Sequence, residues 1–275
     1  MANITIGADP EFAFVDQNGR LKRPDSIIRS SNNDAQFGID GAGRVAELRP
    51  RHGNTPRELV TEIKRVMQGG LEQYPAGANL RWKAGGVAEE EPMGGHIHLG
   101  HGQLCDRLVA ANVGDALNRI VAPLVLMAED REEAVLRRIG SSYGQLVGEN
   151  CWREQPWGIE YRVLSSWLTS PDDALSVLTA TYLVGKNFDN PAFMDAALSL
   201  PEVDNDFFTD CNKKVISFYL QEIARVMKKA IGYRDLLPDM RHLFSMIIER
   251  KTFNTSRDMK EAWGLSLPQI PVGAR

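Results

Sequence analysis

The sequence has few cysteines, and their spacing forms no recognisable site. The three cysteines are odd in number and far apart, and no CxxC pair occurs. This pattern argues against a disulfide framework or a thiolate metal site and suits a reducing cytoplasm. The sequence also lacks a GxxxxGK[ST] phosphate loop and a GxGxxG turn after its first predicted strand. If a nucleotide binds, neither of these glycine-rich motifs holds it.

Long hydrophobic runs and a basic field are missing as well. The longest apolar run, Ile120 to Ala128, contains Pro123 and is far too short to span a membrane. The start, MANITIGADPEF, has no basic segment followed by an apolar one, so we expect no signal peptide. The net charge of -4 gives no overall attraction to nucleic acid. We expect a cytoplasmic protein without a membrane partner.

The composition and the order of predicted elements suggest a single α+β domain. The chain has 275 residues, 43% hydrophobic and 25% charged, which is enough for a sizeable core. Strand patterns fill the first part of the chain and helix patterns the second, without βαβ alternation. We therefore expect one domain over residues 1–275, with site strands within 1–170, a mostly helical part over 171–275 and a mainly antiparallel sheet.

Local signals place the elements along the chain. Thr55, Pro56 and Glu58 form a helix start, which we expect to end at Gly69 and Gly70. Ser170 and Pro171 start another helix in the same way. Strands are predicted at 3–6, 11–15, 37–40, 44–49, 80–84, 94–99 and 159–165, and further helices at 107–139, with a break near Pro123, at 215–231 and at 237–248.

Four predicted strands carry charged or histidine side chains on one face and apolar side chains on the other. Side chains alternate between the two faces of a strand, so His96 and His98 in GGHIHLG lie opposite Ile97 and Leu99. The same rule pairs Asp9 with Glu11, Glu47 with Arg49, and Glu160 with Arg162. One such strand would be an ordinary solvated face. Four of them predict a polar sheet face with a common role.

This face is suited to divalent cations and phosphate. Several carboxylates around one concavity would repel each other without a cation, and carboxylate-rich sites favour Mg²⁺ or Mn²⁺ over zinc. Arginines beside the acids suggest contacts with phosphate oxygens. Small neighbours such as Gly7, Gly94 and Gly95 allow a ligand to approach the backbone. The residues therefore predict metal-dependent phosphoryl transfer.

The ordered motifs resemble those of a known family. ADPEF, DGAGRVAELRP, GGHIHLG and WGIEYRVLSSWL, followed by Pro171, are similar to the phage phiEco32-like COOH-NH2 ligases of type 2, a branch of the glutamine synthetase and glutamate-cysteine ligase superfamily. The resemblance covers about residues 7–171. It implies a saddle-shaped, mainly antiparallel sheet with helices on its convex face. It also implies an ATP- and Mg²⁺-dependent ligase that joins a carboxylate to an amine through an acyl phosphate.

The resemblance assigns roles to the residues of the polar face. The residues that it implies for metal are Asp9, Glu11, Glu47, His96 and Glu160. His98 and Arg162 would contact the phosphates, and Arg162, Glu47 and Arg49 are the catalytic candidates. Asp9 is a departure, because the relatives commonly have glutamate there. Lys83, in a strand next to the histidines, is a further candidate contact for ATP.

The segment Gly140 to Gly158 is glycine-rich and aromatic and directly precedes the last site strand. We expect a lid or substrate-binding loop, with Tyr143 and Arg153 as candidate substrate contacts; a plain surface loop is the alternative. Other residues are expected to be structural. Arg137 and Arg138 should lie at a helix end, and the tryptophans at 82, 152, 157 and 167 should pack in the interior.

Three other functions fit part of the pattern. A metal-dependent hydrolase would use His96, His98 and the acids but leave the Glu and Arg strands unexplained. The second alternative is an inactive phage structural or binding protein. The third is a guanidino kinase, which would stop at phosphoryl transfer. The expected partners are small-molecule or peptide carboxylates and amines, with nucleic acid only as a modified-base substrate. A phage-encoded enzyme would work in the host bacterial cytoplasm, and the sequence does not indicate its oligomeric state.

Overall fold

The computed structural model describes residues 3–28, 36–41, 43–138, 144–146, 150–203 and 213–266. Within these ranges the chain forms an eight-stranded sheet, a two-stranded sheet and a layer of helices. Every strand pairing described is antiparallel. The expected α+β fold with a mainly antiparallel sheet is therefore confirmed.

The main sheet is centred on one long strand, β1 (Thr5–Val15). Its main path runs β3-β4-β1-β8-β10-β9, and β2 and β5 also pair with β1. The other strands of this sheet are β2 (Leu21–Lys22), β3 (Phe37–Ile39), β4 (Ala46–Leu48), β5 (Arg81–Lys83), β8 (Gly95–Gly100), β9 (Trp152–Gln155) and β10 (Gly158–Tyr161). The small sheet pairs β6 (Val87–Ala88) with β7 (Glu91–Pro92). Four strands thus hold β1 in place.

Two strand predictions need correction. We expected separate strands at 3–6 and 11–15, but β1 continues between them because Asp9 and Pro10 pair with β8. The last site strand ends at Tyr161 and does not reach Ser165. Beyond Tyr161 the chain leaves the ladder, and Ser165 forms an isolated bridge with Gly94.

The helices are α1 (Pro56–Gln73), α2 (Arg107–Leu126), α3 (Arg131–Arg138), α4 (Pro171–Lys186), α5 (Pro191–Leu198), α7 (Lys213–Met227), α8 (Tyr233–Glu249) and α9 (Met259–Ala262). Short 3-10 turns occur at Pro24–Ser26, Pro75–Asn79 and Gly102–Cys105. The predicted N-caps are confirmed, since the side chains of Thr55 and Ser170 accept the backbone N–H of Glu58 and Asp173.

Gly70 does not end α1, contrary to the prediction, because this glycine has a packing role. A Cβ at Gly70 would lie 2.1 Å from Cδ2 of Phe37. The glycine lets the β3 ring pack directly against the helix, and α1 continues to Gln73. Glycine is needed at position 70 because the Phe37 ring occupies the space of a side chain, and not because the backbone turns left-handed there.

Pro123 does not break α2, and the interruption lies between Leu126 and Arg131. A proline removes the N–H that would bind the carbonyl four residues earlier. The hydroxyl of Tyr219 lies 2.9 Å from the carbonyl oxygen of Arg119 and donates to it instead. By length and composition α2 is apolar enough to cross a membrane, but most of it is buried among the other helices, as in a core helix.

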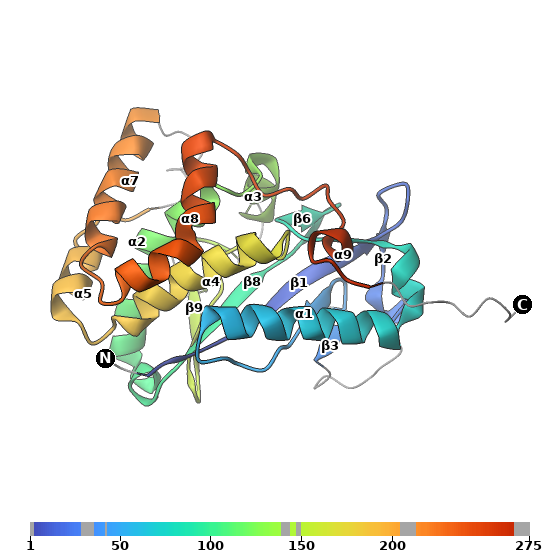
Figure 1. The fold of residues 1–275 in the computed structure, drawn as a ribbon, viewed down its shortest axis with the longest axis horizontal. Coiled ribbons are helices and arrows are strands. Elements are labelled where there is room, and N and C mark those ends of the chain that lie inside the picture. Colours follow the sequence, from blue (N-terminus) through green and yellow to red (C-terminus); the bar gives the residue numbers. More distant parts are fainter. Residues whose placement is uncertain are drawn as a thin grey trace, which may run out of the picture.

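The sheet separates an apolar face from a polar one. The helices cover the apolar face, and α1 and α4 cross in front of the strands in Figure 1. Phe12 and Phe14 of β1 pack there against Phe37 and Trp82, with ring centroids 5.0 Å apart for Phe12 and Trp82. Because side chains alternate along β1, Asp9 and Glu11 face the other way. Residues of both the strand-rich and the helical parts belong to one core cluster.

Candidate functional site

Strand register brings the predicted acids and histidines onto the same face of the sheet. Asp9 of β1 lies opposite His96 of β8, and Glu160 of β10 lies opposite His98. On the other side of β1, Glu11 lies opposite Glu47 of β4. Residues directly opposite each other in neighbouring strands point to the same face. The side chains that the sequence pattern grouped are therefore neighbours in the structure.

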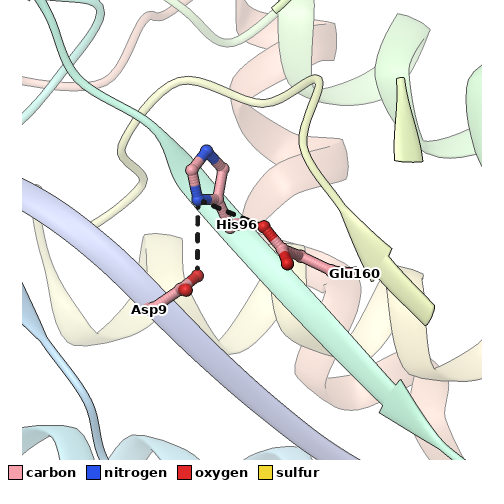
Figure 2. A group of neighbouring side chains, drawn as sticks. All are labelled: Asp9, His96 and Glu160. Carbon is pink, nitrogen blue, oxygen red and sulfur yellow. Dashed lines mark ion pairs between the residues drawn. The ribbon is translucent and has the colours of Figure 1, made fainter. Parts of the chain in front are cut away.

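The first group, which we call the histidine cluster, consists of Asp9, His96 and Glu160. One ligand atom from each lies within 4.8 Å of the others. Figure 2 shows the three side chains converging from three adjacent strands, with His96 Nδ1 3.4 Å from Asp9 Oδ1 and 3.8 Å from Glu160 Oε1. His98 adjoins this cluster, with its Nε2 3.1 Å from Asp9 Oδ1. The arrangement can supply nitrogen and oxygen ligands to one cation.

Buried polar atoms without hydrogen bonds support this interpretation. Among the described residues, Asp9 Oδ1, His98 Nε2 and Glu160 Oε1 are buried and have no partner with hydrogen-bond geometry. Glu160 is 1% exposed. Its other oxygen, Oε2, accepts hydrogen bonds from Arg153 Nε and Gln155 Nε2, both at 2.7 Å. Oε1 faces His96 Nδ1 and Arg162 Nε without hydrogen-bond geometry, which makes it the candidate metal ligand of this carboxylate.

The histidines keep the histidine cluster ionised. Burial opposes a charge on Asp9, but His96 and His98 together hold the pKa of Asp9 below its usual range. Burial also opposes a charge on His96, yet the neighbouring carboxylates, Asp9 first, raise the pKa of His96. Opposite charges at short range favour both ionised forms. The cluster therefore balances its own charge.

The second group, which we call the carboxylate cluster, consists of Glu11, Asp40 and Glu47. One oxygen of each lies within 4.8 Å of the others. Glu11 Oε2 accepts the backbone N–H of Gly94 at 2.6 Å, which fixes its position. Burial, reinforced by the charges of Asp9, Glu11 and Asp40, raises the pKa of Glu47 to about 8. This all-oxygen set suits Mg²⁺.

Asp40 is a candidate ligand that the sequence analysis missed. It follows β3, in the turn before β4, and its N–H donates to the carbonyl of Val45 at 3.0 Å. Gly38 lies opposite Glu47, so a residue two positions after Gly38 returns to the polar face. Applying the alternation rule to the segment 37–40 would have found Asp40.

Arginines lie beside both clusters. Arg49 forms an ion pair with Glu47 and donates to the carbonyl of Ile39 at 3.0 Å. Arg162 Nε lies 3.2 Å from Glu160 Oε1. Arg153 comes from the edge strand β9, and its half-exposed side chain pairs with Glu160 at 2.6 Å. Positive groups are thus available where phosphate or carboxylate oxygens would meet the clusters.

Arg137 and Arg138 lie in the last turn of α3, at a helix end as expected, but both side chains are buried. Arg137 is 2% exposed, and its guanidinium donates to the carbonyls of Met93 and Val163, both at 2.9 Å. Met93 precedes Gly94, which binds Glu11, and Val163 follows Arg162. Arg138 is buried against Glu129 at 3.1 Å. Arg137 therefore ties together the backbone beneath both clusters.

The remaining candidates lie in different surroundings. Lys83 Nζ is 2.6 Å from Glu133 Oε1 and donates to the carbonyl of Val87, so its contact with ATP stays a prediction. Residues 152–155 form the paired strand β9, which corrects the expectation of a loop throughout Gly140 to Gly158. Tyr143 lies outside the described residues.

Trp157 also departs from its expected place in the interior. Trp82 and Trp167 are buried as expected, and Trp152 is partly buried against the core. Trp157 is 41% exposed, and its ring centroid lies 4.8 Å from that of His98. The turn between β9 and β10 thus places an exposed aromatic ring beside the polar face. The signal in the sequence that separates Trp157 from the core tryptophans is its position directly before the last site strand.

Two solved structures were found to be similar to this chain, and the first of them has a similar fold. A chain from the crystal structure of the complex between prokaryotic ubiquitin-like protein Pup and its ligase PafA matches with a TM-score of 0.50 and 14% identity. The match covers 91% of this chain and 66% of that chain, so this chain spans just under two thirds of its length. A chain from a GmaS/ADP complex has a TM-score of 0.43 and 12% identity, covering 90% of this chain and 70% of that one.

The sequence comparisons identify the family. No curated protein matches the chain. A family model does match it, over residues 6–265, which includes both clusters and most of the helices. The chain belongs to the phage phiEco32-like COOH-NH2 ligase-type 2 family.

Proposed function

We propose that this protein is an ATP- and Mg²⁺-dependent carboxylate-amine ligase that forms an amide through an acyl phosphate. The main support is one observation: two clusters of metal-ligand side chains lie on one sheet face, each beside an arginine. A ligase must bring together polyphosphate and a carboxylate, both negative, and cations make that possible. The family description agrees with the reaction class.

The first step activates the substrate carboxylate. Its oxygen bonds to the γ-phosphorus of ATP as the bond to ADP breaks. Arg162 and Arg49 neutralise phosphate oxygens in this step, and His98 Nε2 faces the same space. Mg²⁺ or Mn²⁺ held by the histidine and carboxylate clusters would supply further charge neutralisation. Asp9, Glu11, Asp40, Glu47, His96 and Glu160 are the side chains that would hold it.

The second step forms the amide. The amine bonds to the acyl carbon, the bond to phosphate breaks, and the nitrogen loses its extra proton to solvent. Arg153 is the candidate contact for a substrate carboxylate, because its half-exposed side chain already pairs with Glu160. Water must be kept from the acyl phosphate until the amine arrives. Tyr143 remains a second candidate for substrate contact.

The substrates belong to the class of small-molecule or peptide carboxylates and amines. The similar PafA chain is a ligase for Pup, which is a protein. Peptide and protein carboxylates therefore deserve testing beside free amino acids.

The deciding experiment is a screen for ADP release over amino acids, peptides and amines with Mg²⁺ or Mn²⁺. We expect Glu11→Gln and Glu160→Gln each to lower the rate about 100-fold or more, because each removes a charged ligand from one cluster. Glu62→Gln on the exposed side of α1 is the matched control and should change nothing. Wild-type turnover by both site variants would show that the site assignment is wrong.

Three further measurements separate this function from the alternatives. Hydrolysis with metal and no ATP would favour the hydrolase, which the His96 and His98 pair also suits. ADP formation with a phosphorylated guanidino product and no amide would favour a kinase. A wild-type chain that binds no Mg²⁺-ATP in calorimetry would be an inactive scaffold.

A further inference from the structure

The polar face changes character beyond His98. Thr5 of β1 lies opposite Gly100 of β8, and Gly158 of β10 lies opposite the same Gly100. Gly7 lies opposite His98 in the next register position on this face. We call Thr5, Gly7, Gly100 and Gly158 the small-residue floor. Beyond the charged clusters, the polar face therefore consists of small residues that leave the backbone accessible.

The packing of this floor excludes larger side chains at two of its positions. Gly158 has φ of +149°, and a Cβ there would lie 2.1 Å from the carbonyl oxygen of Leu99. A Cβ at Gly100 would lie 2.3 Å from Thr5 Oγ1. Gly158 therefore requires glycine for its conformation as well as its space. The small-residue floor therefore has no bulky side chains at Gly100 and Gly158 next to the clusters.

Trp157 borders this floor. It directly precedes Gly158, and its carbonyl accepts the N–H of His101 at 3.0 Å, which anchors the turn to the end of β8. The ring is tilted by 41° against His98 and is 41% exposed. Tryptophan is highly buried on average, and an exposed ring beside a polar face offers an apolar surface for a flat ligand. His98 lies between this ring and the histidine cluster, with its Nε2 3.1 Å from Asp9 Oδ1.

We infer that the base of the nucleotide stacks on Trp157, over the small-residue floor. This inference rests on the proposed function, because it assumes that the phosphates lie over the clusters. The Trp157 ring centroid lies 4.8 Å from that of His98, and His98 is about 7 Å along β8 from His96, so a base on Trp157 would lie next to the phosphates bound at the histidine cluster. A neutral, flat base gains little from carboxylates and much from an aromatic face.

Calorimetry with two probes tests the inference: Mg²⁺-ADP and Mg²⁺-pyrophosphate, which differ by the nucleoside. Trp157→Ala should weaken ADP binding about 5- to 150-fold and leave pyrophosphate binding within about twofold of wild type. Trp157→Phe should retain most of the ADP affinity. Phe218→Ala removes another exposed aromatic ring, on α7, and should alter neither affinity.

Other outcomes would overturn the inference in distinguishable ways. Equal loss of ADP and pyrophosphate binding in Trp157→Ala would show that the residue supports the phosphate site and holds no base. A wild-type chain that binds both probes equally tightly would refute base stacking while the proposed function stands. A wild-type chain that binds neither probe would refute both. In wild type, ADP but not pyrophosphate should quench tryptophan fluorescence, and Trp157→Phe should lose this difference.

Discussion

The two clusters on the polar face balance their charges differently. In the histidine cluster, His96 and His98 lie against Asp9, and Arg153 and Arg162 lie against Glu160. The carboxylate cluster brings three acids together, with Arg49 paired to Glu47. The two histidines lower the pKa of Asp9 against the effect of burial, whereas burial, with a smaller contribution from the neighbouring acids, raises the pKa values of Glu11 and Glu47. The first cluster contains cationic partners for its acids, whereas the second has three acids and one arginine, so we expect a bound cation to stabilise the second more.

Removing Arg137 should have the largest effect, because this residue supports both clusters. Arg137→Met leaves the buried carbonyls of Met93 and Val163 without their donor. We expect the free energy of unfolding, measured with urea, to fall by about 3 kcal/mol or more. Arg65→Met on the exposed side of α1 breaks a solvated pair with Glu62 and should cost about 0.5 kcal/mol or less. Equal losses in the two variants would contradict the linking role of Arg137.

Neutralising one acid in each cluster should affect stability in opposite directions. Asp9→Asn removes the charge that both histidines face, so we expect a loss of about 1–3 kcal/mol in unfolding free energy at neutral pH. Glu47→Gln relieves repulsion in the carboxylate cluster and should cost nothing or stabilise the metal-free protein slightly. Chelator-treated protein is the material for both urea titrations. If Glu47→Gln lowered the free energy of unfolding more than Asp9→Asn, the proposed difference in charge balance between the two clusters would be wrong.

A third expected effect is a pH dependence of the folding stability, caused by Glu47. Its pKa rises from 4.5 to about 8 in the folded state, so the folded protein binds this proton more tightly than the unfolded chain. The associated stability is complete below 4.5 and is lost as the pH rises through about 8. Without metal, the melting temperature should therefore decline over this range, and added Mg²⁺ should raise it most at the alkaline end. In Glu47→Gln this decline should be weaker; an unchanged decline would assign it to another group.

The sequence revealed most of the polar face because alternation along a strand is a local property. Asp9, Glu11, His96 and Glu160 could be placed from period-two patterns alone, and the register then brought them together. The glycines at positions 7, 94 and 95 also indicated a face that a ligand can approach closely. What a local pattern could not supply was the pairing partner of each strand, which decides that two distinct clusters form.

The residues that were missed depend on tertiary contacts. Asp40 lies in a turn, where its position follows from the β3 and β4 pairing. Arg137 looks like an ordinary charged residue at the end of α3, and its burial results from carbonyls that come from distant segments. Pro123 and Gly70 were read as helix breakers, but Tyr219 and Phe37 accommodate them. In each case a partner far along the chain overrides the local tendency.

The continuity of β1 has a consequence for the spacing of bound charge. Asp9 and Glu11 belong to different clusters but are two residues apart on one strand, so their Cα atoms are separated by about 6.6 Å. Four neighbouring strands prevent β1 from bending or slipping. Surface segments around the site can change length or sequence without altering this interval. If each cluster holds a cation, as proposed, β1 would set the distance between the two cations.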